Sequence, residues 1–483
     1  MDSSTTQSQL EAAATALRAH PGIADVALER PSDDAGALLV RVVPRDHSPA
    51  ARPLGFSLFY FADAEADARA QRYRLYLDGA RFADAHGFQA VWTPERHFHE
   101  NGGLYPNPSV LSAALATVTE RVRLRAGSVA LPLHNPLRVA EEWSVVDNLS
   151  NGRVDVSFTS GWIPNDFALA ADPGVFARKR DVMFESLKTV ERLWRRGRVP
   201  VRDGVGNHVE LEIFPKPVQT RLPVWITCSG DPSAFVRAGE LGYNILTALL
   251  TQPLEEAAEK VRLYRDARAR VGLEPDGGHV TLMMHTFVGD DEAEVLARVK
   301  RPLTDYLKSH IDLMKTMVSS LNISLDDIDL TQPKWAEYLA SFAFERYYRM
   351  GSLIGTPDKC LEMVGRVKEL GFDEVACLID FGVPVDAVLG GLMPLAEVKR
   401  RSDATVGIDR ARVTRDLEAT LGQAPERLQL VIVDRLPGKN VARAASSIAR
   451  AEIAAAVDID ARAEKQKQAR ERQKQLMRMG RGQ

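Results

Sequence analysis

Short β-prone runs alternate with longer segments of helical spacing between residues 54 and 401, and this alternation constrains the fold more than any other feature. The eight runs are 54–61, 89–93, 122–131, 154–158, 223–227, 243–246, 279–288 and 373–381. Helical segments lie between them, at 68–86, 109–119, 137–149, 175–194, 232–241 and 253–271. Parallel strands need such crossover helices, so the pattern predicts an α/β fold, a (β/α)8 TIM barrel with insertions.

Three of these runs end in polar or small residues. Run 89–93 is followed by Pro94-Glu95-Arg96-His97, and run 154–158 by Thr159-Ser160-Gly161-Trp162. Gly127-Ser128 interrupts run 122–131. A (β/α)8 barrel keeps its chemistry at the C-terminal ends of its strands. The three ends together therefore predict a functional site, although ordinary turns would place similar residues at any single end.

The composition is that of a soluble globular protein, with 45% hydrophobic and 26% charged residues and a net charge of −3. This balance argues against a nucleic-acid-binding protein, which would carry a basic face. No run approaches ~18 apolar residues, so no membrane span is expected. The three cysteines are too scattered for a disulfide framework or a zinc site, and the N-terminus lacks a signal-peptide pattern. These features predict a cytoplasmic protein.

Segments outside the barrel have a different character. Residues 1–53 contain a helical segment at 8–20 and two strands at 24–28 and 37–43, and residues 402–460 contain a helix at 413–421 and a strand at 428–433. The Lys/Arg/Gln-rich tail 461–483 is typical of a solvated helix or linker, with a docking helix as the alternative. Within the barrel, the insertion 293–349 is longer than a crossover helix needs and predicts a lid, or else helices that pad the barrel or form a dimer contact.

Long motifs of the barrel resemble the bacterial luciferase-like, flavin-dependent monooxygenases, most of all the branch embedded in nonribosomal peptide synthetases. The resemblance covers about residues 54–401. It is carried by WTPERHF at 92–98, YPNP at 105–108, RAGSV at 125–129, RVAEEWSVVDNLS at 138–150, SGW at 160–162, PVWIT at 223–227 and HTFVG at 285–289.

The flanks resemble another family. Residues 17–27, LRAHPGIADVA, are similar to the start of the small C-terminal subdomain of adenylation enzymes, and residues 434–440, DRLPGKN, are similar to its end. The resemblance implies a monooxygenase inserted into a split subdomain, whose N- and C-terminal segments form one small α/β piece. Gly438-Lys439 follows Pro437 without the family's intervening residues, which argues against adenylation by Lys439. A plain α/β cap is the alternative.

The resemblance also implies a site for flavin mononucleotide (FMN). Ser229, Gly230 and Ser233 lie between run 223–227 and the next helix, where helix N–H groups and hydroxyls suit a phosphate; Asp231 suits a helix cap. A plain helix cap without a ligand is the alternative. Gly127-Ser128 matches the place where the family has a non-prolyl cis peptide beneath the flavin ring. Thr159, Ser160 and Gly161 would lie at the neighbouring strand end, with no metal ligands expected.

For catalysis the resemblance points to Glu95, Arg96 and His97, with His97 as the main acid–base group. Luciferase has two adjacent histidines where this chain has Arg96-His97, so the role of the first falls on Arg96 or moves to His97. Ala248 stands where the branch tends to have a histidine. A Glu95–Arg96 ion pair that closes the barrel rim is the structural alternative. His99, His134, His285 and His310 are each interpreted as structural, because their spacing contains no metal motif.

The implied activity is hydroxylation at the α-carbon of an aminoacyl or peptidyl group, such as glycyl, tethered to a carrier protein, with a terminal amide as one outcome. Reduced FMN would come from a separate flavin reductase, because no GxGxxG dinucleotide motif follows a strand, and O2 would be the co-substrate. Family barrels often form homodimers. Two alternatives stay open: a deazaflavin-dependent oxidoreductase on the same barrel, and a catalytically inactive docking module of a synthetase.

Overall fold

The computed structural model describes residues 7–19, 23–29, 37–44, 53–61, 72–100, 102–249, 252–309, 333–404, 410–421 and 427–432. The chain divides into two compact units: His47–Arg410, and Met1–Asp46 together with Ala411–Gln483. The sequence pattern predicts these boundaries at 53/54 and 401/402. Residues 438–439 and the tail 461–483, for which the sequence raised specific hypotheses, lie outside the described residues.

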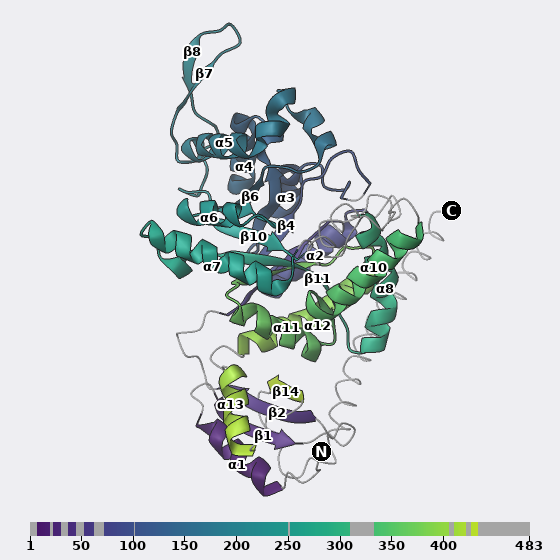
Figure 1. Ribbon diagram of the computed structural model, residues 1–483. Coiled ribbons are helices and arrows are strands. Elements are labelled where there is room, and N and C mark those ends of the chain that lie inside the picture. Colours follow the sequence, from purple (N-terminus) through teal and green to yellow (C-terminus); the bar gives the residue numbers. More distant parts are fainter. Residues whose placement is uncertain are drawn as a thin grey trace, which may run out of the picture. The chain divides into compact units, whose positions relative to one another are not determined.

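Eight parallel strands form a closed barrel in the larger unit (Figure 1). They are β3 (Gly55–Phe59), β4 (Ala90–Thr93), β5 (Arg123–Ala130), β6 (Val154–Thr159), β9 (Val224–Thr227), β10 (Asn244–Ala248), β11 (Val280–Val288) and β13 (Glu374–Leu378). Neighbours pair in the order β10-β9-β6-β5-β4-β3-β13-β11, and β10 pairs with β11 to close the ring. The predicted (β/α)8 barrel is confirmed.

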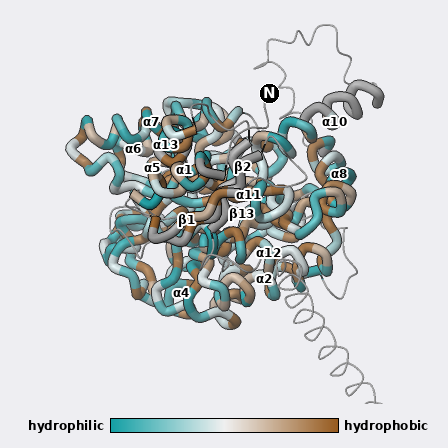
Figure 2. Tube along the Cα trace, turned by 90° about the horizontal axis from the view of Figure 1, so that it is seen from below, coloured by the Kyte–Doolittle hydropathy of each residue, from teal (hydrophilic) through white to brown (hydrophobic). Residues whose placement is uncertain are grey.

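Helices surround the barrel strands. They are α2 (Arg74–Ala85), α3 (Pro108–Ala116), α4 (Pro136–Leu149), α5 (Lys179–Trp194), α6 (Pro232–Glu240), α7 (Leu254–Arg270), α8 (Glu292–Ser309), α10 (Pro333–Met350), α11 (Pro357–Glu369) and α12 (Val385–Ala404). Hydrophilic and hydrophobic residues alternate along helices such as α4 and α8 (Figure 2), as expected where one face packs and the other meets water. No described helix is both long and apolar enough to cross a membrane.

Four of these helices begin with the same N-terminal motif, a capping side chain followed by a proline. Asn107, Asn135, Asp231 and Thr356 each precede a proline and accept a backbone N–H of the first turn with their side chains. Proline at the first helical position has no N–H to leave unsatisfied, and its fixed φ suits a helix. The sequence pairs Asn-Pro, Asp-Pro and Thr-Pro therefore fix where the helices after β4, β5, β9 and β12 start, and hence how long the loops at the barrel rim are.

A charged layer fills part of the barrel interior. Arg125 on β5 donates to Asp155 Oδ2 at 2.7 Å and to Glu374 Oε2 at 2.6 Å. Its guanidinium lies 4.9 Å from the ring centre of Trp92 and 4.6 Å from that of Trp225. Burial would raise the pKa of Glu374, but Arg125 and the hydrogen bonds it receives lower it well below its ordinary value. Arg125, Asp155 and Glu374 therefore form an ionised, paired cluster in the barrel interior.

The insertion after β11 packs against the barrel in its described part. Helices α8 and α10 contact each other, and the short strand β12 (Leu353–Gly355) extends the sheet by pairing with the end of β11. The ring of His285, on β11, is contacted by Tyr306 from α8 and by Tyr347 from α10. Residues 310–332, which include His310, lie outside the described residues. The described helices thus cover the end of β11, while a lid motion remains a prediction.

The segment 198–221 leaves the barrel as a hairpin of β7 (Val199–Arg202) and β8 (His208–Leu211), which pair antiparallel. It returns through a cis peptide bond between Phe214 and Pro215. This hairpin accounts for the Val-, Pro- and Gly-rich composition of the segment.

The smaller unit is a three-stranded sheet with two helices. Strand β2 (Ala37–Pro44) pairs antiparallel with β1 (Ile23–Glu29) and parallel with β14 (Arg427–Ile432). Helices α1 (Gln7–Arg18) and α13 (Arg410–Leu421) complete it. Its buried apolar residues come from both ends of the chain: Leu10, Ala13, Leu17, Ile23, Val26, Val40, Val42, Val413 and Leu417. The predicted small α/β piece, built from the N- and C-terminal segments, is confirmed.

Candidate active site

The predicted site residues gather at one rim of the barrel. Strands β4, β5, β6 and β9 are consecutive neighbours, so their C-terminal ends lie side by side. Glu95 and His97 follow β4, Gly127 and Ser128 belong to β5, and Thr159 ends β6. The three strand ends singled out in the sequence therefore form one continuous edge.

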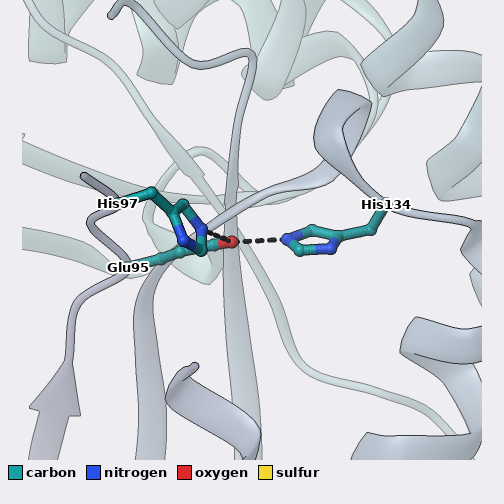
Figure 3. Close-up of side chains that lie close together, drawn as sticks. All are labelled: Glu95, His97 and His134. Carbon is teal, nitrogen blue, oxygen red and sulfur yellow. Dashed lines mark hydrogen bonds and ion pairs between the residues drawn. The ribbon is translucent and has the colours of Figure 1, made fainter. Parts of the chain in front are cut away.

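Glu95 is the centre of a hydrogen-bonded cluster at this rim (Figure 3). Its Oε1 atom accepts from His97 Nε2 at 2.8 Å and also from His134 Nε2, and its Oε2 atom accepts from the Ala130 backbone N–H at 2.7 Å. The side chain is only 1% exposed. His134 lies just after η1 (Leu131–Leu133), which follows β5, so the cluster ties the loop after β4 to the loop after β5.

Charge on the cluster follows from these bonds. Burial alone would raise the pKa of Glu95, but the hydrogen bonds from His134, His97 and Ala130 outweigh it and lower the pKa to about 2. Burial would lower the pKa of His134, but its hydrogen bond to Glu95 and the charge of that carboxylate raise it above the ordinary value. Glu95 is thus an anion at neutral pH, with a cationic partner favoured at His134.

The same three residues are of types that bind divalent metals, and their donor atoms lie within 4.8 Å of one another. Both imidazole nitrogens, however, point at the same carboxylate oxygen, and an ionised carboxylate only accepts. In this hydrogen-bonded arrangement each Nε2 atom therefore carries the proton. The arrangement is that of a hydrogen-bonded acid–base cluster.

Arg96 pairs with Asp166 rather than with Glu95, so the structural alternative of a Glu95–Arg96 ion pair is wrong. Its Nη1 atom donates to both carboxylate oxygens of Asp166, at 3.1 and 2.9 Å, and its guanidinium lies 5.8 Å from the Trp162 ring centre. Asp166 belongs to η2 (Pro164–Leu169), in the loop after β6. Arg96 is buried at this contact. The physical reason is competition: two imidazoles already occupy Glu95, which leaves Asp166 as the partner of Arg96.

The peptide bond between Gly127 and Ser128 is cis, as the resemblance implied. A Cβ atom at Gly127 would meet Phe59 at 2.8 Å and Trp92 at 3.0 Å, so the position admits glycine without rearrangement. The Ser128 hydroxyl hydrogen-bonds to that of Thr227, which also lies 2.8 Å from the Ser157 hydroxyl. Hydroxyls from β5, β6 and β9 thus line the rim beside a glycine backbone.

The end of β6 supplies two small residues and a turn. Gly161 has a φ of +74°, and a Cβ there would meet the Phe167 ring at 3.0 Å. Its backbone N–H points to the Thr159 hydroxyl at 3.4 Å. Ser160 lies between them. The glycine therefore lets the chain turn sharply over Phe167 and keeps Thr159 and Ser160 at the rim, as the sequence predicted.

The turn from β9 into α6 provides a helix N-terminus. Asp231 caps it by accepting from the Ser233 N–H at 2.9 Å, which confirms the predicted cap. Ser229, Gly230 and Ser233 are exposed there. Asp231 also pairs with Arg180 of α5 at 2.8 Å. The guanidinium offsets the charge of the capping carboxylate at a place where backbone N–H groups favour an anion.

From the sequence, His134 is interpreted as structural, and three further residues of this rim are not selected: Asp166, Thr227 and Arg180. Thr227 ends a predicted strand and His134 lies three residues beyond another, so their place near strand ends was a usable signal. Asp166 and Arg180 lie in or beyond the long loop after β6. No local pattern marks either of them as a partner of the rim.

Known proteins share both the sequence pattern and the fold. A sequence profile described as luciferase-like monooxygenase matches residues 53–374. The oxygenase component of the flavin-dependent trigonelline monooxygenase of Acinetobacter baylyi is 24% identical over 367 residues, which cover 74% of this chain and 98% of that protein. The 4-hydroxyprotoasukamycin monooxygenase of Streptomyces nodosus subsp. asukaensis is 30% identical over 302 residues, covering 61% of this chain and 76% of the relative.

Solved structures show the same barrel. The oxygenating constituent of 3,6-diketocamphane monooxygenase from Pseudomonas putida, in complex with FMN, superposes with a TM-score of 0.57 at 17% identity, covering 71% of this chain and 97% of that one. An F420-dependent secondary alcohol dehydrogenase reaches 0.52 at 18% identity, covering 72% and 98%. The profile match extends over most of the barrel and includes every residue of the rim, so the chain belongs to the luciferase-like monooxygenase family.

Proposed function

We propose that this protein uses reduced FMN and O2 to hydroxylate the α-carbon of an aminoacyl or peptidyl group, such as glycyl, tethered to a carrier protein. In the balanced reaction, the substrate C–H bond, O2 and reduced FMN become a C–OH bond, water and oxidised FMN. The observation that carries the flavin part is the arrangement of the rim, which brings the Ser128 and Thr227 hydroxyls and the Glu95–His97–His134 cluster to the ends of neighbouring strands. Family membership supports it.

The residues at the rim fit FMN. Gly127 carries no side chain of its own at the rim, because Phe59 and Trp92 fill the space beside its Cα atom, and the Ser128 and Thr227 hydroxyls lie next to it as hydrogen-bonding groups for a flavin ring. The N-terminus of α6, with Ser229, Ser233 and the Arg180 guanidinium, suits the phosphate. When bound, reduced FMN supplies the oxygen chemistry with O2. The protein's task is to bind it, keep water out and place the substrate.

His97 is the base in this proposal. Its Nε2 is held by Glu95, so in the neutral ring Nδ1 carries the lone pair that accepts the α-proton next to a thioester carbonyl. Arg96 acts differently: it anchors the loop after β6 through Asp166 and keeps Trp162 at the rim. With glycine as the last residue of a tethered peptide, the hydroxylated product can break its Cα–N bond, leaving a terminal amide on the peptide and a carrier-bound glyoxylyl thioester.

Support for a carrier-bound substrate comes from the flanks. Both ends of the chain join in one sheet through the β2–β14 pairing. Their sequences resemble an adenylation subdomain, a module that works beside carrier proteins. The barrel would then act within a synthetase rather than on a free metabolite, with reduced FMN delivered by a flavin reductase.

The test combines purified protein, FMN, a flavin reductase with NADH, O2, and a glycyl-loaded carrier protein. Mass spectrometry of the carrier arm follows the gain of one oxygen atom. Free glycine and a glycyl thioester without carrier are the matched controls. Hydroxylation of the carrier-bound form alone is expected. Equal turnover of the free thioester would overturn carrier recognition, and no oxygen incorporation with any tethered aminoacyl group would overturn the hydroxylase proposal.

Deazaflavin chemistry is the second candidate, because an F420-dependent enzyme shares the fold at a TM-score of 0.52. Parallel titrations with FMN and with F420 separate the two. Preferential binding of F420, with hydride transfer that needs no O2, would replace the FMN proposal.

A further inference from the structure

Two imidazoles share one oxygen atom of Glu95. His97 Nε2 and His134 Nε2 both bind Oε1, and the two rings approach the carboxylate from different sides (Figure 3). Their ring centres are 6.4 Å apart. The other oxygen, Oε2, is committed to the Ala130 N–H. The carboxylate is therefore fully engaged and fixed in orientation.

The two histidines differ in their surroundings. His97 is 10% exposed, whereas His134 is 32% exposed. His134 and Glu95 line a cavity of about 200 Å³ whose wall does not include His97. Solvent protons thus have a route to His134 that does not pass His97. The two rings are equivalent in their bond to Glu95 but not in their access to water.

The charges around His134 favour its cationic form. Glu95 faces it directly, and Glu142 on α4 lies on the same cavity wall. Arg138, also on the wall, is paired with Glu142 at 2.7 Å, which limits its repulsion of a second cation. His97, the third residue of the cluster, also interacts electrostatically with Asp166 of η2, which is paired with Arg96. Two carboxylates and one paired arginine therefore surround His134 and outweigh the loss of water around it.

A lone buried carboxylate would hold a proton on any imidazole that it contacts, because an adjacent opposite charge favours the charged form. A base used in catalysis must instead release that proton near neutral pH. We propose that His134 is a positioning residue whose cationic ring balances the charge of Glu95, so that Glu95 orients His97 without keeping it protonated. The catalytic meaning rests on the proposed function of His97, but the charge balance itself does not.

The charge balance is testable in the cofactor-free protein. Two-bond ¹⁵N–¹H correlation spectra of ¹⁵N-histidine-labelled protein report the protonation of each ring, and His97→Gln and His134→Gln assign the two signals. In His134→Gln, which keeps an N–H donor but removes the charge, the titration of His97 should move to higher pH by roughly one unit. In His134→Lys, which restores a positive charge, it should return towards that of the wild-type protein.

His208→Gln, an exposed position on the β8 hairpin, is the matched control and should change nothing at His97. An unchanged His97 titration in His134→Gln, or the same shift in His134→Lys as in His134→Gln, would overturn the proposal. Should His134→Gln fail to fold, His134→Asn, which also removes the charge, takes its place, and an unchanged His97 titration in it would overturn the proposal.

The hydroxylase assay separates this inference from the proposed function. The acidic limb of the pH–rate profile should move to higher pH in His134→Gln and less so in His134→Lys. Hydroxylation with a wild-type pH profile in both variants would leave the proposed function standing and refute the role of His134. If FMN does not bind or no product forms, but the NMR titration of His97 shifts as predicted, the charge balance at His134 stands and the proposed function is refuted.

Discussion

Arg180 of α5 forms an ion pair with Asp231, the residue that caps α6, with 2.8 Å between Nη1 and Oδ2. The pair brings a guanidinium to the helix N-terminus where we expect the FMN phosphate. Asp231 alone would repel that phosphate, so Arg180 is predicted to make the site suitable for an anion.

Arg180→Ala should therefore raise the dissociation constant for FMN about tenfold, which corresponds to ~1.4 kcal/mol. Calorimetric titration measures it. Arg178→Ala is the matched control, because Arg178 pairs with Asp172 in the loop before α5. Equal weakening in both variants would show that general positive charge, rather than the Arg180–Asp231 contact, attracts the cofactor.

Gly127→Ala should destabilise the fold by roughly 1–3 kcal/mol, as overpacking of a dense core does. The added methyl group would lie 2.8 Å from Phe59 and 3.0 Å from Trp92, and FMN binding should weaken with it. Gly365→Ala in α11 is the control: its new Cβ meets nothing within 4 Å, so helix propensity predicts equal or higher stability. Urea unfolding compares them, and a Gly127→Ala protein as stable as Gly365→Ala would refute the tight contact.

Arg125→Met should cost about 3–5 kcal/mol, because it leaves the carboxylates of Asp155 and Glu374 buried without their shared cation. The side chain of Glu374 is fully buried. Denaturant unfolding gives the value. Replacing the exposed Arg262, which lies 3.7 Å from Glu259, should change stability by less than ~1 kcal/mol. A similar decrease in the free energy of unfolding in the two variants would contradict the stabilising role of the buried Arg125 ion pairs.

Stability should depend on pH through Glu95 and His134. The pKa of Glu95 is lowered from 4.5 to about 2, so its contribution is present above pH 4.5 and is lost as the pH falls towards 2. The pKa of His134 is raised above 6.5, so its contribution is present below pH 6.5 and is lost as the pH rises through the folded value. The difference in melting temperature between the wild-type protein and Glu95→Gln should thus be largest between pH 4.5 and 6.5. A difference that does not vary with pH would show that packing, not charge, stabilises the cluster.

The sequence was sufficient for the barrel because each strand and helix carries its own local signal. Gly87 ends α2, Pro108 and Pro232 open α3 and α6, and the β-branched runs coincide with strands to within a few residues. The location of the candidate site could be predicted as well, because the C-terminal ends of parallel strands meet at one edge of the barrel. The cis peptide at Gly127–Ser128 followed from the resemblance alone.

The hydrogen-bond and ion-pair partners of the rim side chains could not be predicted from the sequence. Glu95 and Arg96 are adjacent in sequence, so an ion pair between them was the simplest reading, yet consecutive side chains leave a rim loop in different directions. Which carboxylate each residue meets depends on His134 and Asp166, which arrive from the loops after β5 and β6. Such long-range choices are set by tertiary packing, for which a single sequence offers no periodic signal.

We propose above that this rim binds FMN and supports monooxygenation. The most direct measurement is titration of the purified protein with reduced FMN without O2, followed by addition of isotope-labelled O2 in the presence of glycyl-loaded carrier protein. We expect saturable binding and one oxygen atom in the product that carries the isotope of the supplied O2. Failure to bind FMN in either redox state, or product oxygen that comes from water, would contradict it.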